Sequence, residues 1–359
     1  MFIIINIITI YSLIISIYNY ITIKRISQSK IKASRNISIL IPARNEEKNI
    51  KKLLDSILKQ KYNEYEVVIL NDNSTDNTEE ILKEYTYKDS RIRYINGKVL
   101  PKDWRGKTYA CYQLGNIARN EILLFLDADV ILNNENSLEY IINAFDKGLA
   151  SIFPTQISNS IISKLIARAY LNWWPFSILP IKYLQDKRSQ YGAVAVGQAL
   201  MIDNSSYSKL NPFKRHKSQL IEDIYITKDA IRRNIPFQTI IGNNYITCSM
   251  YDSYINTIKG FSRSYYLINN NISAYIFNTI FILIHLIPYI LVFFNLIYLI
   301  PILIISINKI IITIQNRYNI VEEILFNLIQ LTNLIIISIQ SLVYNIKNEY
   351  IWKDRKYNS

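Results

Sequence analysis

Three long stretches without a charged side chain limit what this chain can fold into. They cover Phe2–Ile23, Ile272–Asn308 and Ile324–Ile346. A helix rises ~1.5 Å per residue, so the first stretch is about 33 Å long as a helix and can cross a bilayer. Pro288 and Pro301 lie within the second stretch. A proline kinks or ends a helix, so we expect this stretch to form either one long kinked helix or a hairpin of two helices. We therefore expect an N-terminal transmembrane anchor at residues 1–24 and a C-terminal membrane region at 272–346 with two or three helices.

Basic residues directly follow the first apolar stretch and indicate its orientation. They are Lys24, Arg25, Lys30, Lys32 and Arg35. The positive-inside rule then places the N-terminus outside and the next domain in the cytoplasm. A cleaved signal peptide is the weaker alternative, because no basic residue precedes the stretch and no small-residue cleavage site follows it. The sequence therefore predicts a multi-pass protein of the cell membrane whose soluble part faces the cytoplasm.

The last residues, 347–359, form a basic and aromatic tail typical of a cytoplasmic membrane interface. Its basic residues are Lys347, Lys353, Arg355 and Lys356. The chain has 41 Lys and Arg against 28 Asp and Glu, a net charge of +13 that either nucleic acid or an anionic membrane surface would attract. Because the clearest basic clusters flank the apolar stretches and no nucleic-acid-binding motif occurs, we expect a membrane and no nucleic acid as partner. The two cysteines, Cys111 and Cys248, exclude a disulfide scaffold.

Residues 36–265 alternate between strand and helix patterns. Short apolar runs at 37–41, 66–70 and 122–126 and a run at 91–95 predict strands, and helices are expected after Asn45, from Thr78, at 108–119 and from Glu222. Asn45 is the expected N-cap of the first helix. Strands that alternate with helices form a mostly parallel sheet with right-handed crossovers. The predicted fold class is therefore α/β, flanked by transmembrane helices.

Carboxylates follow two of the predicted strands, where α/β sheets bind ligands. Asp72 follows the second strand, and Asp127 and Asp129 follow the fourth. Side chains two residues apart in an extended segment point to the same side. Paired carboxylates without Cys or His neighbours suit a hard cation such as Mg²⁺ or Mn²⁺. A solvated turn is the alternative for the Asp-Ala-Asp sequence taken alone.

For the other candidate residues, a purely structural role is the alternative to a role in catalysis or binding. Lys107 lies in Gly106-Lys107-Thr108, but position 101 is Pro101 rather than the glycine that an ATPase phosphate loop requires. Lys107 is thus either a basic side chain near a diphosphate or a solvated helix start. Asp223, after Glu222, is either a general base or a complement to the helix dipole. The absence of GxSxG and HExxH sequences excludes the hydrolase triads and zinc proteases that carry them. Trp173-Trp174-Pro175-Phe176 contacts either the membrane interface or a core.

Taken together, these segments resemble glycosyltransferase family 2, the inverting enzymes with a GT-A fold. The matching segments are Ile41-Pro42-Ala43-Arg44-Asn45-Glu46, Asn71-Asp72-Asn73-Ser74-Thr75-Asp76, Leu126-Asp127-Ala128-Asp129 and Glu222-Asp223. Leu100 to Lys107, the flanking apolar stretches and the tail are similar to a membrane-bound branch that includes carotenoid and hopanoid-associated glycosyltransferases. The resemblance implies a GT-A domain at 36–265 with a Rossmann-like mixed sheet.

The resemblance also implies roles for the residues. Asp72 would contact the nucleotide, with Pro42, Arg44 and Glu46 in the same pocket, and Gly197 near the sugar. Asp127 and Asp129 would hold the nucleotide-sugar and its Mn²⁺ or Mg²⁺, with Asp129 the more direct ligand. Asp223 would be the general base. The donor would be a UDP- or GDP-sugar and the acceptor a lipid or a molecule at the membrane interface.

The chain departs from the pattern of processive family members. These carry a Q/RxxRW sequence after the base, whereas the nearest match here is Gly260-Phe261-Ser262-Arg263-Ser264. Polymer synthesis is therefore not expected, although Arg263 remains a candidate diphosphate contact, as Lys107 does. A polyprenyl-phosphate glycosyltransferase, an inactive membrane interaction protein and a transporter are the alternatives. The presence of all four aspartates that the resemblance singles out argues against an inactive protein; they are Asp72, Asp127, Asp129 and Asp223. The lack of recurring charges in the apolar stretches argues against a transporter.

Overall fold

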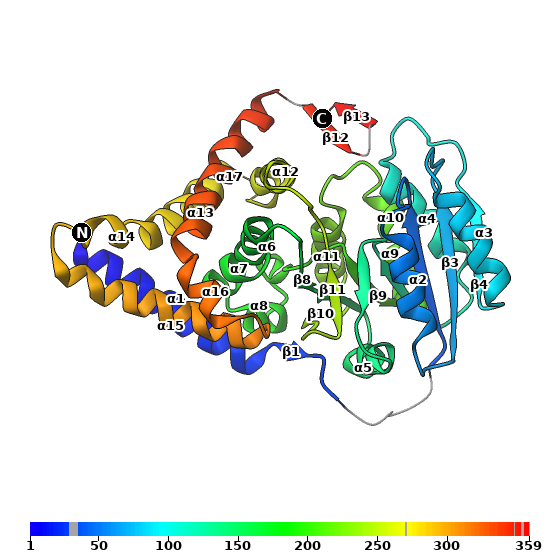
Figure 1. Ribbon diagram of the computed structural model, residues 1–359, viewed down its shortest axis with the longest axis horizontal. Coiled ribbons are helices and arrows are strands. Elements are labelled where there is room, and N and C mark those ends of the chain that lie inside the picture. The colour runs from blue at the N-terminus through cyan, green and yellow to red at the C-terminus, as the bar shows by residue number, and fades with distance from the viewer. Residues whose placement is uncertain (29–34, 270, 348, 353–354, 359) are drawn as a thin grey trace. The chain divides into compact units, whose positions relative to one another are not determined.

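The computed structural model describes residues 1–28, 35–269, 271–347, 349–352 and 355–358 and divides into two compact units (Figure 1). We call the first the α/β unit; it comprises residues 24–155 and 184–249. The second, the helical unit, comprises residues 1–23, 156–183 and 250–359. Each unit is described by itself below.

A mixed sheet of eight strands forms the core of the α/β unit. All neighbouring strands pair in parallel except β9, which is antiparallel to both of its neighbours, β5 and β7. In spatial order the strands are β1 (Lys24–Arg25), β10 (Phe237–Ile241), β7 (Leu149–Phe153), β9 (Ala199–Asp203), β5 (Ile122–Leu126), β2 (Ile37–Ala43), β3 (Tyr65–Asn71) and β4 (Ile92–Asn96). A small sheet has the order β6 (Val130–Leu132), β11 (Ile246–Cys248) and β8 (Thr155–Gln156).

Helices connect the strands of the α/β unit. They are α2 (Ile50–Leu58), α3 (Thr78–Lys88), α4 (Gly106–Ile117), α5 (Ser137–Ala144), α9 (Asn204–Leu210), α10 (Pro212–Arg215) and α11 (Glu222–Arg232), with a 3₁₀ turn at Gln190–Gly192. The apolar stripe of α2 is fully buried at Ile50, Leu53, Leu54 and Ile57. Burial of such a stripe contributes more to a short helix than intrinsic propensity does.

The predicted α/β order is confirmed, and the four predicted strands correspond to β2, β3, β4 and β5. The predicted cap at Asn45 is wrong. Asn45 has a positive φ of 52°, and α2 begins only at Ile50. The Asn45 carboxamide oxygen instead accepts a hydrogen bond from the Thr75 backbone N–H at 2.8 Å. Asparagine tolerates this left-handed conformation, so it shapes a loop here rather than starting a helix.

The helical unit holds the apolar stretches. Its elements are α1 (Phe2–Thr22), α6 (Ile161–Arg168), a π-helical turn (Ala169–Trp173), α7 (Trp174–Ile178), α12 (Tyr254–Asn269), α13 (Ile272–Leu286), α14 (Pro288–Leu291), a 3₁₀ turn (Leu296–Tyr298), α15 (Leu299–Gln315), α16 (Ile320–Leu325), α17 (Asn327–Lys347), β12 (Glu349–Trp352) and β13 (Arg355–Asn358). Helix α8 (Ile181–Asp186) lies at the boundary of the two units. Among the described residues, four helical segments are long and apolar enough to cross a membrane: 2–22, 272–291, 296–315 and 327–346.

The two units do not follow the expected single range of residues 36–265. Residues 156–183 and 250–265 pack with the long apolar helices instead. The reason is the apolar character of α6 to α7: Trp173 is 1% exposed and Phe176 is fully buried in the helical unit. Of the two readings of the Trp-Trp-Pro-Phe segment, the structure favours core packing.

Parts of the predicted basic clusters lie outside the described residues, namely Lys30, Lys32 and Lys353. Of the described members, Lys24 pairs with Asp146 at 2.9 Å. The Arg35 guanidinium donates hydrogen bonds to the backbone carbonyls of Phe145 and Asp146. Lys24 and Arg35 therefore also stabilise the first residues of the α/β unit.

Candidate functional site

The predicted site residues converge on one edge of the main sheet. Strands β2, β3 and β5 are parallel neighbours, with Pro42 opposite Leu70 and Leu40 opposite Phe125. Their carboxyl ends therefore meet at the same edge. The segments that carry Pro42, Asp72 and Asp127 all leave the sheet there.

Hydrogen bonds join the loops that follow β2 and β3. The Arg44 guanidinium donates to the backbone carbonyl of Asp72 at 2.6 Å, and the Asp72 N–H donates to the Ala43 carbonyl at 2.8 Å. The Glu46 N–H donates to Thr78 Oγ1 at 2.8 Å. Asp72 is only 5% exposed. Arg44 thus fixes the position of Asp72, and Glu46 ties the first loop to the start of α3.

Lys107 contacts several parts of the site at once. It lies in the first turn of α4, and its Nζ is 2.7 Å from Asp127 Oδ1 and 2.8 Å from Asp127 Oδ2. The same nitrogen is 3.7 Å from Glu222 Oε1 and donates to the Gly197 carbonyl at 3.4 Å. Burial alone would lower the pKa of Lys107, but the carboxylates of Asp127 and Glu222 raise it, so the side chain is positively charged.

Asp223 faces the same position from the start of α11. Its Oδ1 accepts a hydrogen bond from the Ile224 N–H at 2.9 Å. A Cβ added to Gly197 would lie 3.4 Å from Lys107 Nζ and 3.6 Å from Asp223 Oδ2, so the missing side chain keeps the space between them open. Burial, followed by the negative charge of Glu222, raises the pKa of Asp223 to about 7. Such a carboxylate is matched to proton transfer near neutral pH.

Asp129 has a different environment from Asp127. Its Oδ1 is buried and has no hydrogen-bond partner among the described residues. Burial raises the pKa of Asp129 to about 7, and the charges of Asp127 and Glu46 add to this effect, while a hydrogen bond from the Cys248 thiol opposes it. In the part of the chain that the structure describes, no group of three or more His, Cys, Asp or Glu residues is arranged to hold a metal ion.

The structure adds two residues to those proposed from the sequence. Glu222 is a partner of Lys107, and Cys248 reaches Asp129 because β11 pairs with β6, with Cys248 opposite Val130. Strand pairing over more than 100 residues leaves no local signal, so Cys248 could not be found from spacing. Arg263 lies on α12 in the helical unit. Its expected contact with a diphosphate stays a prediction.

This site lies mainly within a segment that known proteins share. Residues 38–210 match the model of the family described as glycosyl transferase family 2. This segment is therefore similar to glycosyl transferase family 2. It includes Asp72, Asp127, Asp129 and Gly197, whereas Asp223 lies beyond its end.

Curated relatives extend the similarity beyond this segment. A 4,4'-diaponeurosporenoate glycosyltransferase of Staphylococcus haemolyticus is 31% identical over 239 residues, which is 64% of this chain and 61% of the relative. The protein of the same name from Staphylococcus aureus (strain bovine RF122 / ET3-1) is 29% identical, over 63% of this chain and 59% of the relative. The chain therefore matches about 60% of the length of these relatives.

A solved structure shares the fold over nearly the whole chain. It is the mannosyltransferase PcManGT from Pyrobaculum calidifontis in complex with GDP-Man and Mn²⁺. The TM-score is 0.52 at 13% sequence identity, and the match covers 96% of this chain and 98% of PcManGT. The predicted fold class, a GT-A type mixed sheet accompanied by helices long and apolar enough to span a membrane, is confirmed.

Proposed function

We propose that the protein is an inverting, metal-dependent glycosyltransferase that moves a sugar from a UDP- or GDP-sugar to a lipid or membrane-interface acceptor. The observation that carries this proposal is the contact of Lys107 with both Asp127 and Glu222. Through it, the Asp-Ala-Asp segment and the Glu222-Asp223 helix start lie close together on either side of Lys107. A donor-binding group and a candidate base at one place suit group transfer.

The donor nucleotide would occupy the pocket at the ends of β2 and β3. Asp72 accepts hydrogen bonds from the base or ribose in this proposal, and Pro42 and Glu46 line the pocket. Arg44 positions Asp72 through its bond to the Asp72 carbonyl. Lys107 lies within reach of a diphosphate, and Arg263 is a further candidate for that contact.

The carboxylates fit a divalent cation, with Asp129 as the main ligand. Its buried Oδ1 has no partner among the described residues, whereas both oxygens of Asp127 already contact Lys107. Carboxylate oxygens together with diphosphate oxygens are the usual ligands of Mg²⁺ and Mn²⁺. PcManGT was solved with Mn²⁺. A bound cation would offset the negative charge that develops on the leaving nucleoside diphosphate.

Asp223 acts as the general base in this proposal. It takes the proton from the acceptor oxygen while that oxygen forms a bond to the anomeric carbon of the sugar. The bond from the anomeric carbon to the diphosphate oxygen breaks, and the electron pair leaves with the nucleoside diphosphate. Attack from the face opposite the leaving group inverts the anomeric carbon. Gly197 leaves room for the sugar between Lys107 and Asp223.

We propose an acceptor of the carotenoid or terpenoid type at the membrane. The names of the curated relatives support this choice, since diaponeurosporenoate is a carotenoid acid. The four apolar helices support a multi-pass membrane location, and the basic residues after α1 support a cytoplasmic α/β unit. A polyprenyl phosphate is the alternative acceptor, and Gly260-Phe261-Ser262-Arg263-Ser264 supports a single transfer rather than polymer synthesis.

The test incubates membranes that contain the full chain with Mn²⁺, a panel of UDP- and GDP-sugars and the two acceptor classes. Mass spectrometry of the lipid extract should detect one glycosylated carotenoid acid. A glycosylated polyprenyl phosphate alone would replace the acceptor proposed here by the alternative. No product with any donor, from membranes in which the protein is folded, would contradict the enzyme proposal and favour an inactive interaction protein.

A further inference from the structure

The direction of α15 in the helical unit follows from its contacts with α1. The rings of Phe2 and Tyr298 are 5.6 Å apart, and the Gln315 side chain donates to the Asn19 carbonyl at 3.2 Å. The N-terminal ends of the two helices therefore lie together, as do their C-terminal ends. The chain passes from α1 directly into the α/β unit at Lys24. The C-terminal end of α15 is thus on the side of the membrane that carries the α/β unit.

Helix α17 runs back toward the side where α13 begins, as its contacts with α13 and α14 indicate. The Asn327 side chain donates to the Tyr289 hydroxyl at 2.9 Å, and the Tyr275 hydroxyl donates to the Ser338 carbonyl at 2.9 Å. Helix α17 therefore runs antiparallel to α13 and α14. These two helices in turn lead into α15 through the short turn at 292–298 and run opposite to it (Figure 1). Helix α17 nevertheless rises at a steep angle to α15 and does not run alongside it (Figure 1).

Helix α12 gives independent support for the position of the end of α17. The Tyr254 hydroxyl donates to Asn333 Oδ1 at 2.8 Å, and the Tyr266 N–H donates to Ser341 Oγ at 2.8 Å. Helix α12 directly precedes α13, so its last residues lie on the side where α13 begins, which is also the side where α1 ends. Ser341, near the C-terminal end of α17, is therefore on that side as well.

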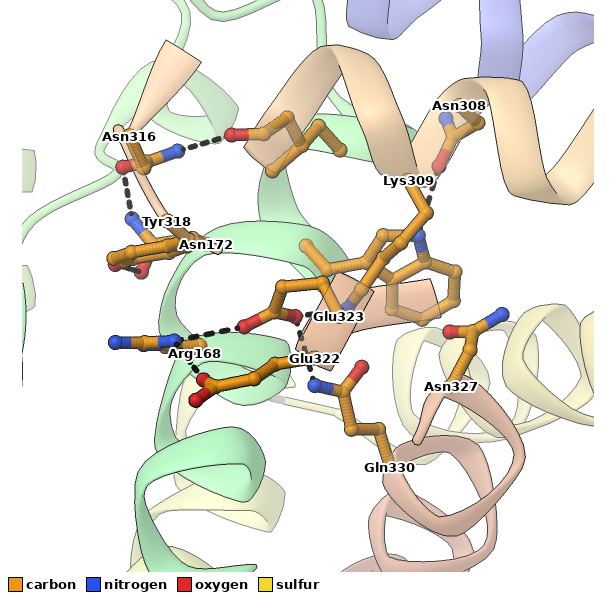
Figure 2. Close-up of polar contacts among 12 residues, drawn as sticks. Arg168, Asn172, Asn308, Lys309, Asn316, Tyr318, Glu322, Glu323, Asn327 and Gln330 are labelled. Atoms are coloured by element: carbon orange, nitrogen blue, oxygen red, sulfur yellow. Dashed lines mark hydrogen bonds and ion pairs between the residues drawn. The ribbon is translucent and has the colours of Figure 1, made fainter. Parts of the chain in front are cut away.

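The connection at 316–326 turns back along α15, where buried charges hold Glu323 beside Lys309. Glu323 of α16 is 1% exposed. Its Oε2 is 3.1 Å from Lys309 Nζ and accepts from Gln330 at 2.8 Å, while its Oε1 is 3.2 Å from Arg168 Nη1 (Figure 2). One carboxylate thus joins α15, α17 and α6.

A second set of contacts holds the first half of the connection. The Asn172 side chain donates to Asn316 Oδ1 at 2.9 Å and accepts from the Tyr318 hydroxyl at 2.9 Å (Figure 2). The Arg168 guanidinium lies over the Tyr318 ring, 4.1 Å from its centre. Irregular backbone is tolerated at membrane depth only where protein surrounds it, and these contacts provide such surroundings.

The outer face of α17 is largely apolar. Its exposed residues are Leu328, Ile329, Thr332, Ile336, Ile339, Val343 and Ile346. Their spacing places them along one side of the helix. Helix α17 is also the least apolar of the four candidate spans. This pattern suits a helix with one side against α12 and α13 and the other against acyl chains.

We propose that residues 316–347 form a re-entrant segment, in which α17 does not complete a fourth crossing. The exposed stripe of α17 contacts the acyl chains of the leaflet next to the α/β unit, and the C-terminus returns to that side. Helices α1, α13 with α14, and α15 make the three full crossings. The N-terminus and the C-terminus therefore lie on opposite sides of the membrane.

Cysteine labelling of the full chain in sealed vesicles tests this proposal. Cys111 and Cys248 are buried and stay in place as the unlabelled background. Lys209→Cys marks the side of the α/β unit, and Phe294→Cys, in the turn at 292–298, marks the far side. Asn345→Cys is the test position, and Tyr344→Cys, a half-buried neighbour outside the exposed stripe, replaces it if that variant fails to fold.

We expect a membrane-impermeant maleimide to label Asn345→Cys from the side that labels Lys209→Cys, at least ten times faster than from the other side. Labelling from the side of Phe294→Cys would overturn the proposal, because α17 would then cross the membrane completely. A cysteine that reacts from neither side until detergent is added would overturn it too, since the C-terminal end of α17 would then remain within the lipid.

Discussion

At the scale of single residues, Lys107 links the main parts of the proposed site. Its ammonium group balances Asp127, whose side chain is 24% exposed, and the more buried Glu222, which would otherwise be two neighbouring negative charges. Removing Lys107 leaves these two carboxylates uncompensated. Lys107 therefore contributes to stability as well as to any contact with the donor.

Replacing Lys107 tests this dual role. Lys107→Ala should weaken binding of a UDP- or GDP-sugar at least ~30-fold and lower the melting temperature, because Asp127 then repels the diphosphate. Isothermal titration and thermal unfolding in detergent measure the two effects. Lys102→Ala, an exposed residue of the preceding loop, is the matched control and should change neither. Unchanged donor affinity in Lys107→Ala would remove this residue from the site.

The pKa of Asp223 predicts a pH dependence of transfer. A base must be ionised, and a pKa of about 7 means that Asp223 is protonated below that pH. The value of kcat/KM should therefore rise as the pH increases through about 7 and then level off. Glu222→Gln removes a negative charge that raises this pKa, so the rise should move to lower pH. An identical pH profile in Glu222→Gln would contradict the assignment of Asp223 as the titrating group.

A substitution at Gly197 can reduce activity without affecting folding, so it tests the proposed position of the sugar. A Cβ at this position meets Lys107 and Asp223 at 3.4–3.6 Å, which is ordinary van der Waals contact. Gly197→Ala should thus fold normally but lose transfer activity by ~10-fold or more, because the methyl group fills the space proposed for the sugar. Product formation and thermal unfolding are measured on the same preparation. Full activity would place the sugar elsewhere.

At the scale of elements, strands and site segments were predictable, whereas long-range contacts were not. Buried parallel strands leave apolar runs in the sequence, so β5 was predicted with its observed bounds, Ile122–Leu126. The Asp-Ala-Asp segment follows it directly. By contrast, the contact of Cys248 with Asp129 depends on the pairing of β11 with β6. Asn45 was misjudged because the same residue type favours helix caps and left-handed turns.

Helix α16 permits a matched stability test of the buried charges. Glu323→Gln leaves Lys309 and Arg168 without their fully buried carboxylate, so it should destabilise the protein by about 3–5 kcal/mol. Glu322→Gln changes a more exposed neighbour and should cost at most about 1 kcal/mol. Denaturant unfolding in detergent compares the two. Equal losses of stability in the two variants would show that burial of Glu323 does not increase the contribution of its ion pairs.

At the scale of the whole molecule, the sequence divides between an α/β unit and a unit of long apolar helices. The apolar stretches predicted the candidate spans, because length and lack of charge are local properties. The place of residues 156–183 with those helices was not predictable, since it depends on burial of Trp173 and Phe176 far from the spans in sequence. The basic residues around the apolar stretches support a location at an anionic membrane surface.

The central claim is that four aspartates, Asp72, Asp127, Asp129 and Asp223, belong to an active glycosyltransferase site. The most direct measurement is transfer of a radiolabelled sugar from the nucleotide-sugar to extracted lipid by the wild type and by Asp223→Asn, with exposed Asp103→Asn as control. We expect Asp223→Asn to bind the donor normally and to lose at least ~100-fold in transfer, while Asp103→Asn matches the wild type. Transfer by Asp223→Asn at the wild-type rate would contradict the account.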